Sequence, residues 1–172
     1  SGIGLEISRD LARRGYNLVI VARTKEKLIE TSRELIKEYN IKCDYFSSDL
    51  SLLNSPEEIY QFTSQKQYNV EILINNAGYA LPNAFHINSM EDEEKCLRVL
   101  GTSVIALTKK YINDMISNGV GKIMIVSSVA AFAPASSLQS LYGPVKTFMN
   151  RFSESLNFYN KYGITSTAVC PG

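Results

Sequence analysis

The chain has 172 residues, of which 45% are hydrophobic, and its 18 Lys and Arg against 17 Asp and Glu give a net charge of +1. This length and apolar content suit one globular domain, and the balanced charge without a basic stripe gives no support for nucleic-acid binding. The longest apolar runs have only the length of strands, so no membrane segment is expected within these residues. Three widely spaced cysteines favour reduced thiols and a cytoplasmic protein, although targeting or anchoring segments could lie outside these residues. The lone His86 has no ligand cluster around it, so no metal site is expected.

Strand and helix signals alternate along the chain with short gaps between them. Helices are expected at residues 5–14, 25–39, 55–66, 89–117 and 141–162, and strands at residues 17–22, 41–46, 70–74, 122–126 and 164–169. Thr24, Ser55 and Ser89 stand where helices begin, and Gly101 marks a break in the fourth helix. Apolar strands separated by helices predict an α/β fold with a parallel sheet covered on both faces. Without a repeat or a linker, residues 1–172 are interpreted as a single domain.

The first residues of the chain have the composition of a phosphate-binding helix start. They are Ser1, Gly2, Ile3 and Gly4. Glycines at a helix N-terminus let a phosphate approach backbone N–H groups at the positive end of the helix dipole. A glycine-rich turn without a ligand is the alternative.

Two charged residues follow the next two expected strands. Arg23 comes directly after the first, where dinucleotide-binding folds place an acid for a ribose 2′-hydroxyl or an Arg for a 2′-phosphate. If a dinucleotide binds, Arg23 therefore favours NADP(H) over NAD(H). Asp49 follows the second and could accept a hydrogen bond from an adenine amino group. A solvated charge cluster and an ordinary turn Asp are the alternatives.

Small polar residues or a Pro-Gly pair follow the three remaining strands. In chain order these are Asn75, Asn76, Ala77 and Gly78, then Ser127 and Ser128, then Pro171 and Gly172. The carboxyl ends of parallel strands meet at one edge of a sheet, which is where α/β proteins bind ligands. Each segment could instead be a plain turn.

Tyr142 and Lys146 are four residues apart, and Ser128 lies fourteen residues before Tyr142. On a helix, residues at this spacing share one face, so the phenol and the ammonium are expected to be neighbours. A nearby positive charge stabilises a deprotonated phenol, which suits the pair to proton transfer. A Tyr that faces the core beside a solvated Lys is the alternative.

Taken together, these residues resemble the motifs of the short-chain dehydrogenase/reductase family, in order and at roughly the same spacing. The resemblance implies a doubly wound, Rossmann-type parallel sheet. It also implies Tyr142 as catalytic acid/base, Ser128 as a hydrogen-bond partner of the substrate oxygen, and Lys146 as a ligand of the nicotinamide ribose. The residues expected to bind the cofactor are Ser1, Gly2, Ile3, Gly4, Arg23, Asp49, Leu50, Asn76, Ala77, Gly78, Tyr142, Lys146, Pro171 and Gly172.

The chain departs from the family pattern at three points, one of which is a Ser128–Tyr142 interval one residue longer than is common, a difference that a loop can absorb. The fourth catalytic residue of the family is an Asn eight residues before a Thr, and counting back from Thr108 gives Leu100, whose side chain forms no hydrogen bonds. That Asn helps to hold a water in a proton relay, so the relay is expected to be absent or rerouted here. The first strand, the start of the glycine loop and everything after Gly172 are expected to lie outside these residues. The chain is therefore interpreted as the middle of a longer enzyme.

The resemblance also implies a substrate class and partners. Residues 128–141 are small and apolar and resemble relatives that reduce 3-oxoacyl or steroid ketones, so an apolar ketone or 3-oxoacyl substrate is expected. Family members commonly pair through helices equivalent to residues 90–117 and 141–162, which predicts a homodimer or homotetramer. Two alternatives stay open. One is a non-catalytic dinucleotide-binding relative that acts as a sensor, motivated by Leu100, and the other is a scaffold assembled through the long helices.

Overall fold

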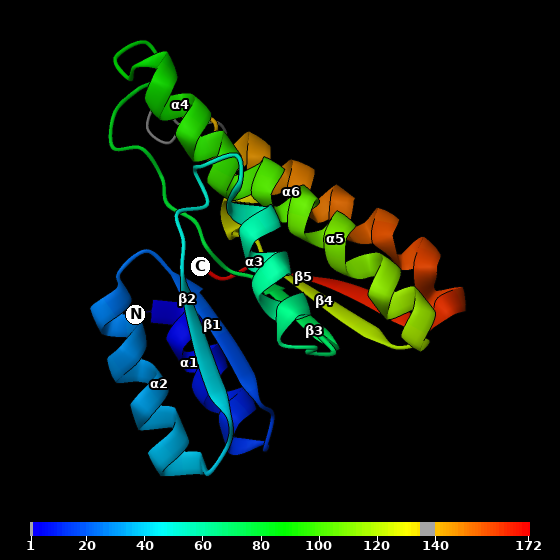
Figure 1. Cartoon of the computed structure of the whole chain (residues 1–172). Coiled ribbons are helices and arrows are strands. Elements are labelled where there is room, and N and C mark those ends of the chain that lie inside the picture. Colours follow the sequence, from blue (N-terminus) through cyan, green and yellow to red (C-terminus); the bar gives the residue numbers. More distant parts are fainter. Residues whose placement is uncertain (1, 135–139) are drawn as a thin grey trace. The chain divides into compact units, whose positions relative to one another are not determined.

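The computed structural model describes residues 2–134 and 140–172, in which helices alternate with parallel strands (Figure 1). The expected α/β fold is thereby confirmed. The chain divides into two compact units, Ser1–Asp49 and Leu50–Gly172. The expectation of a single domain concerns the two units together and stays a prediction. None of the helices in the described part of the chain combines the length and the apolar character that a bilayer crossing requires.

The first unit is built from two strands and two helices. β1 (Leu18–Ala22) and β2 (Cys43–Ser47) pair in parallel, and α1 (Gly2–Arg13) and α2 (Lys25–Tyr39) precede them in turn. All four elements contribute to one apolar core, which burial of aliphatic side chains stabilises. The core consists of Ala12, Leu35, Ile41 and Cys43, with Leu18, Ile20 and Tyr39 packed against it.

The second unit contains a three-stranded parallel sheet of order β3-β4-β5. The strands are β3 (Ile72–Asn75), β4 (Gly121–Val126) and β5 (Ile164–Val169). The helices are α3 (Ser55–Gln65), α4 (Met90–Leu97), α5 (Ser103–Asn118) and α6 (Tyr142–Leu156), with short turns η1 (Arg98–Thr102), η2 (Val129–Ala131) and η3 (Asn157–Tyr162). Asn75 pairs with Ile125 and Val126 with Val169, so the three strands end together at one edge of the sheet.

The long helical region expected at residues 89–117 is continuous but contains a wide turn. α4 begins after Ser89, whose hydroxyl accepts a 3.1 Å hydrogen bond from the N–H of Asp92. Between α4 and α5, residues Arg98–Thr102 form a π-helical turn, which accounts for the break expected near Gly101. A Cβ built on Gly101 would lie 3.7 Å from Cγ1 of Val145, so α6 passes close to this turn. Such π-turns occur often at functional sites.

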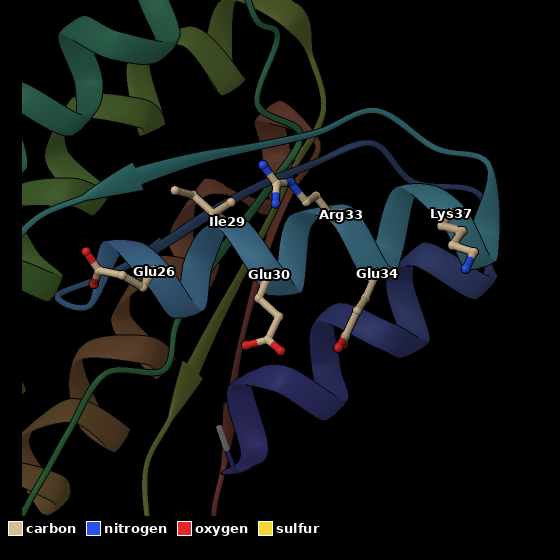
Figure 2. A pocket seen from close by; sticks show the side chains of 6 residues that line it. All are labelled: Glu26, Ile29, Glu30, Arg33, Glu34 and Lys37. Carbon is tan, nitrogen blue, oxygen red and sulfur yellow. The ribbon is translucent and has the colours of Figure 1, made fainter.

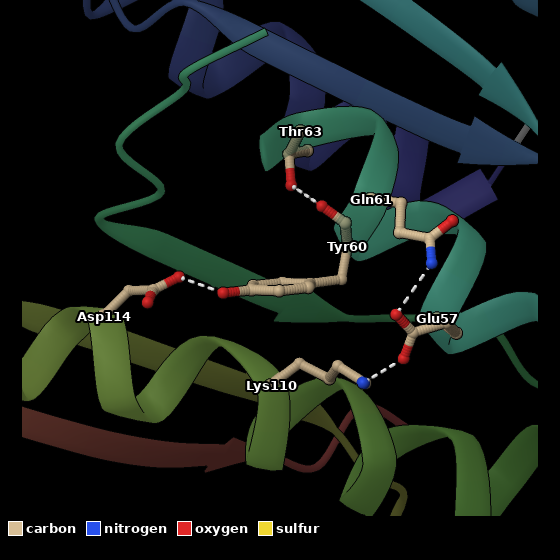
Figure 3. Close-up of polar contacts among 6 residues, drawn as sticks. All are labelled: Glu57, Tyr60, Gln61, Thr63, Lys110 and Asp114. Carbon is tan, nitrogen blue, oxygen red and sulfur yellow. Dashed lines mark hydrogen bonds and ion pairs between the residues drawn. The ribbon is translucent and has the colours of Figure 1, made fainter. Parts of the chain in front are cut away.

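Polar contacts connect α3 to α5 within the second unit (Figure 3). The hydroxyl of Tyr60 donates a 3.0 Å hydrogen bond to Asp114, and Lys110 forms an ion pair with Glu57. Gln61 donates to the same carboxylate, at 3.0 Å. Lys110 and the hydrogen bond from Gln61 hold the pKa of Glu57 below its ordinary value. These contacts join α3 and α5 to each other through polar side chains.

Several elements differ from their expected bounds at the ends. α1 begins at Gly2 rather than at residue 5, so the glycine segment forms the first helical turn itself. β2 and β3 begin later than residues 41 and 70, although the residues directly before them, Lys42 and Glu71, still accept backbone hydrogen bonds from Leu18 and Lys122. The helix expected at residues 141–162 is α-helical only to Leu156 and continues as a 3₁₀ turn. Helix and strand ends are set by pairing and capping that sequence patterns define only loosely.

Candidate functional site

Tyr142 and Lys146 lie one turn apart at the start of α6 and are in contact, as their spacing predicts. The Nζ atom of Lys146 lies 5.4 Å from the centre of the Tyr142 ring. The same ammonium donates a 2.7 Å hydrogen bond to the backbone oxygen of Val126, the last residue of β4. The side chain of Lys146 is therefore fixed between the first turn of α6 and the carboxyl edge of the sheet.

Lys146 is buried, with 4% of its surface exposed. Burial lowers the pKa of its ammonium, because surroundings of low polarity disfavour the charged form. The thiols of Cys170 and Cys96 act in the opposite direction and to a smaller extent. A helix lysine whose ammonium is buried at the carboxyl edge of a sheet is typical of a functional site, since burying its charge costs stability.

Ser128 lies at the end of β4 and caps the short turn η2. Its hydroxyl accepts a 3.1 Å hydrogen bond from the N–H of Ala130. The turn packs on α6, because Thr147 donates a 2.8 Å hydrogen bond to the carbonyl of Ala131 and a Cβ on Gly143 would lie 3.2 Å from the carbonyl of Ala130. The structure thus brings the turn of Ser128 to the first turns of α6, where Tyr142 lies.

The segment after β5 is held beside the segment after β4. The N–H of Ser127 donates to the carbonyl of Val169 at 2.7 Å, and the N–H of Val129 donates to Pro171 at 3.0 Å. Cys170 contacts the side chain of Asn150 on α6, at 3.6 Å. Pro171 and Gly172 therefore belong to the same edge of the second unit as Ser128.

The segment after β3 reaches this edge as well. A Cβ built on Gly78 would lie 3.6 Å from Nζ of Lys146 and 2.9 Å from Cδ2 of Leu100. Leu100, on the π-helical turn, is only 1% exposed. Leu100 stands where the family has its catalytic Asn, and it packs against Gly78. It therefore contributes an apolar wall to the candidate site.

In the first unit, the expected cofactor residues lie at the ends of β1, β2 and α1. Gly2, Ile3 and Gly4 form the first turn of α1, whose N–H groups are available to a phosphate. Arg23 is exposed directly after β1, and its backbone oxygen accepts a 2.9 Å hydrogen bond from Ser47 at the end of β2. Asp49 and Leu50 follow that strand, at the boundary of the two units. Ser1 lies outside the described residues.

The structure also adds polar side chains to the site that the sequence alone did not single out. Glu93 is 2% exposed, although it belongs to an acidic first turn of α4 in which Glu91 and Asp92 are exposed. Cys96 contacts the backbone oxygen of Tyr79, at 3.5 Å. The inward position of Glu93 follows from the helix face that meets the rest of the unit, so no signal in the sequence separates it from its acidic neighbours.

A separate pocket lies along α2 and contains none of the expected site residues (Figure 2). Its lining residues are Glu26, Ile29, Glu30, Arg33, Glu34 and Lys37. Five charged side chains of both signs on one helix face are typical of a solvated surface. We assign the pocket no role in the candidate site.

The sequence profile described as short chain dehydrogenase matches residues 1–172. Among curated proteins, hydroxysteroid dehydrogenase-like protein 1 of Gallus gallus is 30% identical over 175 residues, which cover 99% of this chain and 52% of that protein. The very-long-chain 3-oxoacyl-CoA reductase of Bos taurus is 27% identical, with 99% of this chain and 55% of that protein covered. The chain thus spans about half the length of these relatives.

Solved structures agree with this match over nearly all of the chain. The bulky-bulky ketone specific alcohol dehydrogenase from Comamonas testosteroni superposes with a TM-score of 0.93 at 30% identity, covering 99% of this chain and 68% of the other. A short-chain dehydrogenase from Sphingobium yanoikuyae in complex with NADPH gives a TM-score of 0.93 at 31% identity, covering 99% and 66%. The sheets and helices therefore have the expected Rossmann-type fold, and the chain belongs to the short chain dehydrogenase family.

Proposed function

We propose that the protein is an NADP(H)-dependent oxidoreductase that interconverts a carbonyl and an alcohol, with Tyr142 as general acid/base. The observation that carries the proposal is the buried ammonium of Lys146, held 5.4 Å from the centre of the Tyr142 ring and bonded to Val126 at the sheet edge. A binding-only protein has no need of a buried lysine beside a phenol, since burial of an ammonium is costly. Tyr142 would donate a proton to the substrate oxygen in reduction and accept one in oxidation.

The residues expected to bind a nicotinamide dinucleotide lie at strand ends and at a helix start within each unit. In the first unit, Gly2 to Gly4 offer N–H groups to phosphates, Arg23 offers a guanidinium to a 2′-phosphate, and Asp49 would accept from adenine. In the second unit, Gly78 packs against Leu100 and lies beside the ammonium of Lys146, because a Cβ built on it would be 2.9 Å and 3.6 Å from their side chains. The bound cofactor would supply or accept the hydride.

Lys146 and Ser128 complete the chemistry that this chain can provide. An ammonium has three N–H donors and the bond to Val126 uses one, so others can serve the hydroxyls of a ribose. Ser128 would hydrogen-bond the substrate oxygen that Tyr142 protonates. By family resemblance, the cofactor would also be bound by Asn76, Ala77, Pro171 and Gly172.

We further propose an apolar ketone or a 3-oxoacyl thioester as substrate. Val129 and Phe132, which flank the turn after Ser128, are 50% and 75% exposed and offer an apolar surface beside the reacting group. The names of two relatives, a very-long-chain 3-oxoacyl-CoA reductase and a bulky-bulky ketone specific alcohol dehydrogenase, support the same class. The apolar segment expected at residues 128–141 includes residues 135–139, which lie outside the described residues.

We also propose that the protein assembles into a homo-oligomer through α5 and α6. Phe148 is 53% exposed on α6, and its ring is stacked with that of Phe152 at a centroid distance of 6.5 Å. The exposed ring of Phe148 favours burial against another surface. In the family such helices pair between subunits, so a second copy of the protein is the proposed partner.

The experiment is NADPH oxidation by the intact protein with a panel of ketones and 3-oxoacyl thioesters, alongside Tyr142→Phe. We expect turnover by the wild type and a loss of about 100-fold or more in kcat for Tyr142→Phe, the scale of general acid catalysis, with NADPH binding retained. Tyr162→Phe, at a partly exposed tyrosine of η3, is the matched control. A wild type that binds NADPH but reduces nothing would support the non-catalytic alternative, and full activity of Tyr142→Phe would overturn the mechanism.

A further inference from the structure

Glu93 is a buried carboxylate that connects α4 to the turn before Tyr142. One of its oxygens, Oε1, accepts hydrogen bonds from the hydroxyl of Ser140 and from Nδ2 of Asn88, the latter at 3.0 Å. Asn88 in turn donates a 3.2 Å hydrogen bond to the carbonyl of Asn83. A single carboxylate therefore ties the loop before α4 to the residue two positions ahead of Tyr142.

The second oxygen of Glu93 has no hydrogen-bond donor among the described residues. This oxygen, Oε2, is buried, and the whole side chain is 2% exposed. The start of α4 favours a negative charge, because the helix dipole is positive there. Even so, a buried carboxylate with one unpaired oxygen is costly, and such groups in native proteins call for a functional reason.

Ser140 adopts a backbone conformation that needs an external restraint. Its φ angle is +31°, a value that residues other than glycine rarely adopt and that persists only when the surrounding structure holds it. Leu141 follows, and its carbonyl accepts the hydrogen bond from Val145 that opens α6. The direction in which the chain enters α6, and with it the direction of Tyr142, depends on how this turn is held.

From this geometry we propose that Glu93 is a positioning residue for the reaction. Its carboxylate holds the turn at Ser140 so that the Tyr142 phenol stays beside the ammonium of Lys146. The proposal rests on the proposed function for its catalytic consequence, but the contact and its effect on Tyr142 do not depend on turnover. A displacement of about 1 Å at a reacting group can cost about 100-fold in rate.

The test is a double-mutant cycle of Glu93→Ala and Ser140→Ala in the intact protein. We expect each change to lower kcat by at least about tenfold, with KM and NADPH affinity within about threefold of wild type. Because both changes remove the same contact, the double variant should lose about as much kcat as the more damaging single variant, which is less than the product of the two single fold-losses. Glu93→Gln keeps an acceptor for Ser140 and should recover most of kcat, and Glu94→Ala, at the exposed neighbour, is the matched control.

A second readout is independent of activity. With 3-fluorotyrosine placed at Tyr142, Glu93→Ala and Ser140→Ala should shift or broaden the fluorine resonance, whereas Glu94→Ala should leave it unchanged. An unchanged resonance in both variants overturns the positioning role, as does additive loss of kcat. If the wild type turns over no substrate, the proposed function fails, and the fluorine spectra still decide whether Glu93 positions Tyr142.

Discussion

The Nζ atom of Lys146 donates a 2.7 Å hydrogen bond to the carbonyl oxygen of Val126. This bond joins a side chain of α6 to the last residue of β4 and fixes the ammonium at the edge where three parallel strands end. Burial of the ammonium at this edge costs stability, because the charge would be better solvated in water. The cost has a measurable dependence on pH.

Removal of the Lys146 ammonium should change how stability varies with pH. Burial places its pKa in the folded protein below the unfolded value of about 10.4, so between these two values the unfolded chain binds more protons. The free energy of unfolding of the wild type should therefore rise relative to Lys146→Met as the pH increases from neutral towards 10. Urea unfolding at several pH values measures this difference. A stability difference between the wild type and Lys146→Met that does not change with pH would contradict the prediction.

Substitution of Gly163 by Ala should destabilise the second unit strongly. Gly163 has a φ of +78°, and a Cβ there would lie 2.0 Å from the carbonyl oxygen of Gly119. Left-handed backbone alone costs a non-glycine residue about 1–2 kcal/mol, and the backbone clash adds to this cost. Gly119→Ala is the matched control, because Gly119 has a φ of +69° with nothing within 4 Å of its Cβ position. In thermal unfolding, the Tm of Gly163→Ala should be lower than that of Gly119→Ala. Equal decreases in Tm for the two variants would show that the clash with Gly119 is absent.

A methyl group at Gly78 should conflict with Leu100 in a way that a second substitution relieves. The added Cβ would lie 2.9 Å from Cδ2 of the buried Leu100, an overpacking that typically costs about 1–3 kcal/mol. Leu100→Ala alone should cost about 2–5 kcal/mol by leaving a cavity. The double variant Gly78→Ala/Leu100→Ala should be more stable than the sum of the two losses predicts, because each change offsets the other. Strict additivity in urea unfolding would show that the two residues are not in contact.

Arg23→Asp should erode the preference for NADPH over NADH. An Arg contact with a phosphate is worth about 1.5–3 kcal/mol, so the ratio of the two affinities should fall by about 10- to 100-fold. Arg33→Asp, on the exposed face of α2, makes the same charge change away from the ends of the strands and should leave the ratio unchanged. Titration of both cofactors against the intact variants measures the ratio. An unchanged ratio in Arg23→Asp would remove the basis for NADP(H).

Much of the local structure could be predicted from short-range patterns. Ser89 caps α4 through Asp92, as a Ser ahead of an acidic turn predicts. The four-residue spacing of Tyr142 and Lys146 implied a shared helix face, and their contact confirms it. These outcomes follow from helix geometry and capping, which involve residues close together in the chain.

By itself, the sequence determined the alternation of helices and parallel strands, the order of the motifs at the strand ends and the pairing of Tyr142 with Lys146. Only the tertiary structure decided that Leu100 packs against Gly78 and that Glu93 turns inward to meet Ser140, 47 residues away. Periodicity and capping depend on neighbours within a few positions, and a single chain carries that information directly. Contacts between distant elements depend on which faces meet when the core forms, so an acidic residue in a helix start is exposed or buried according to its partners in space.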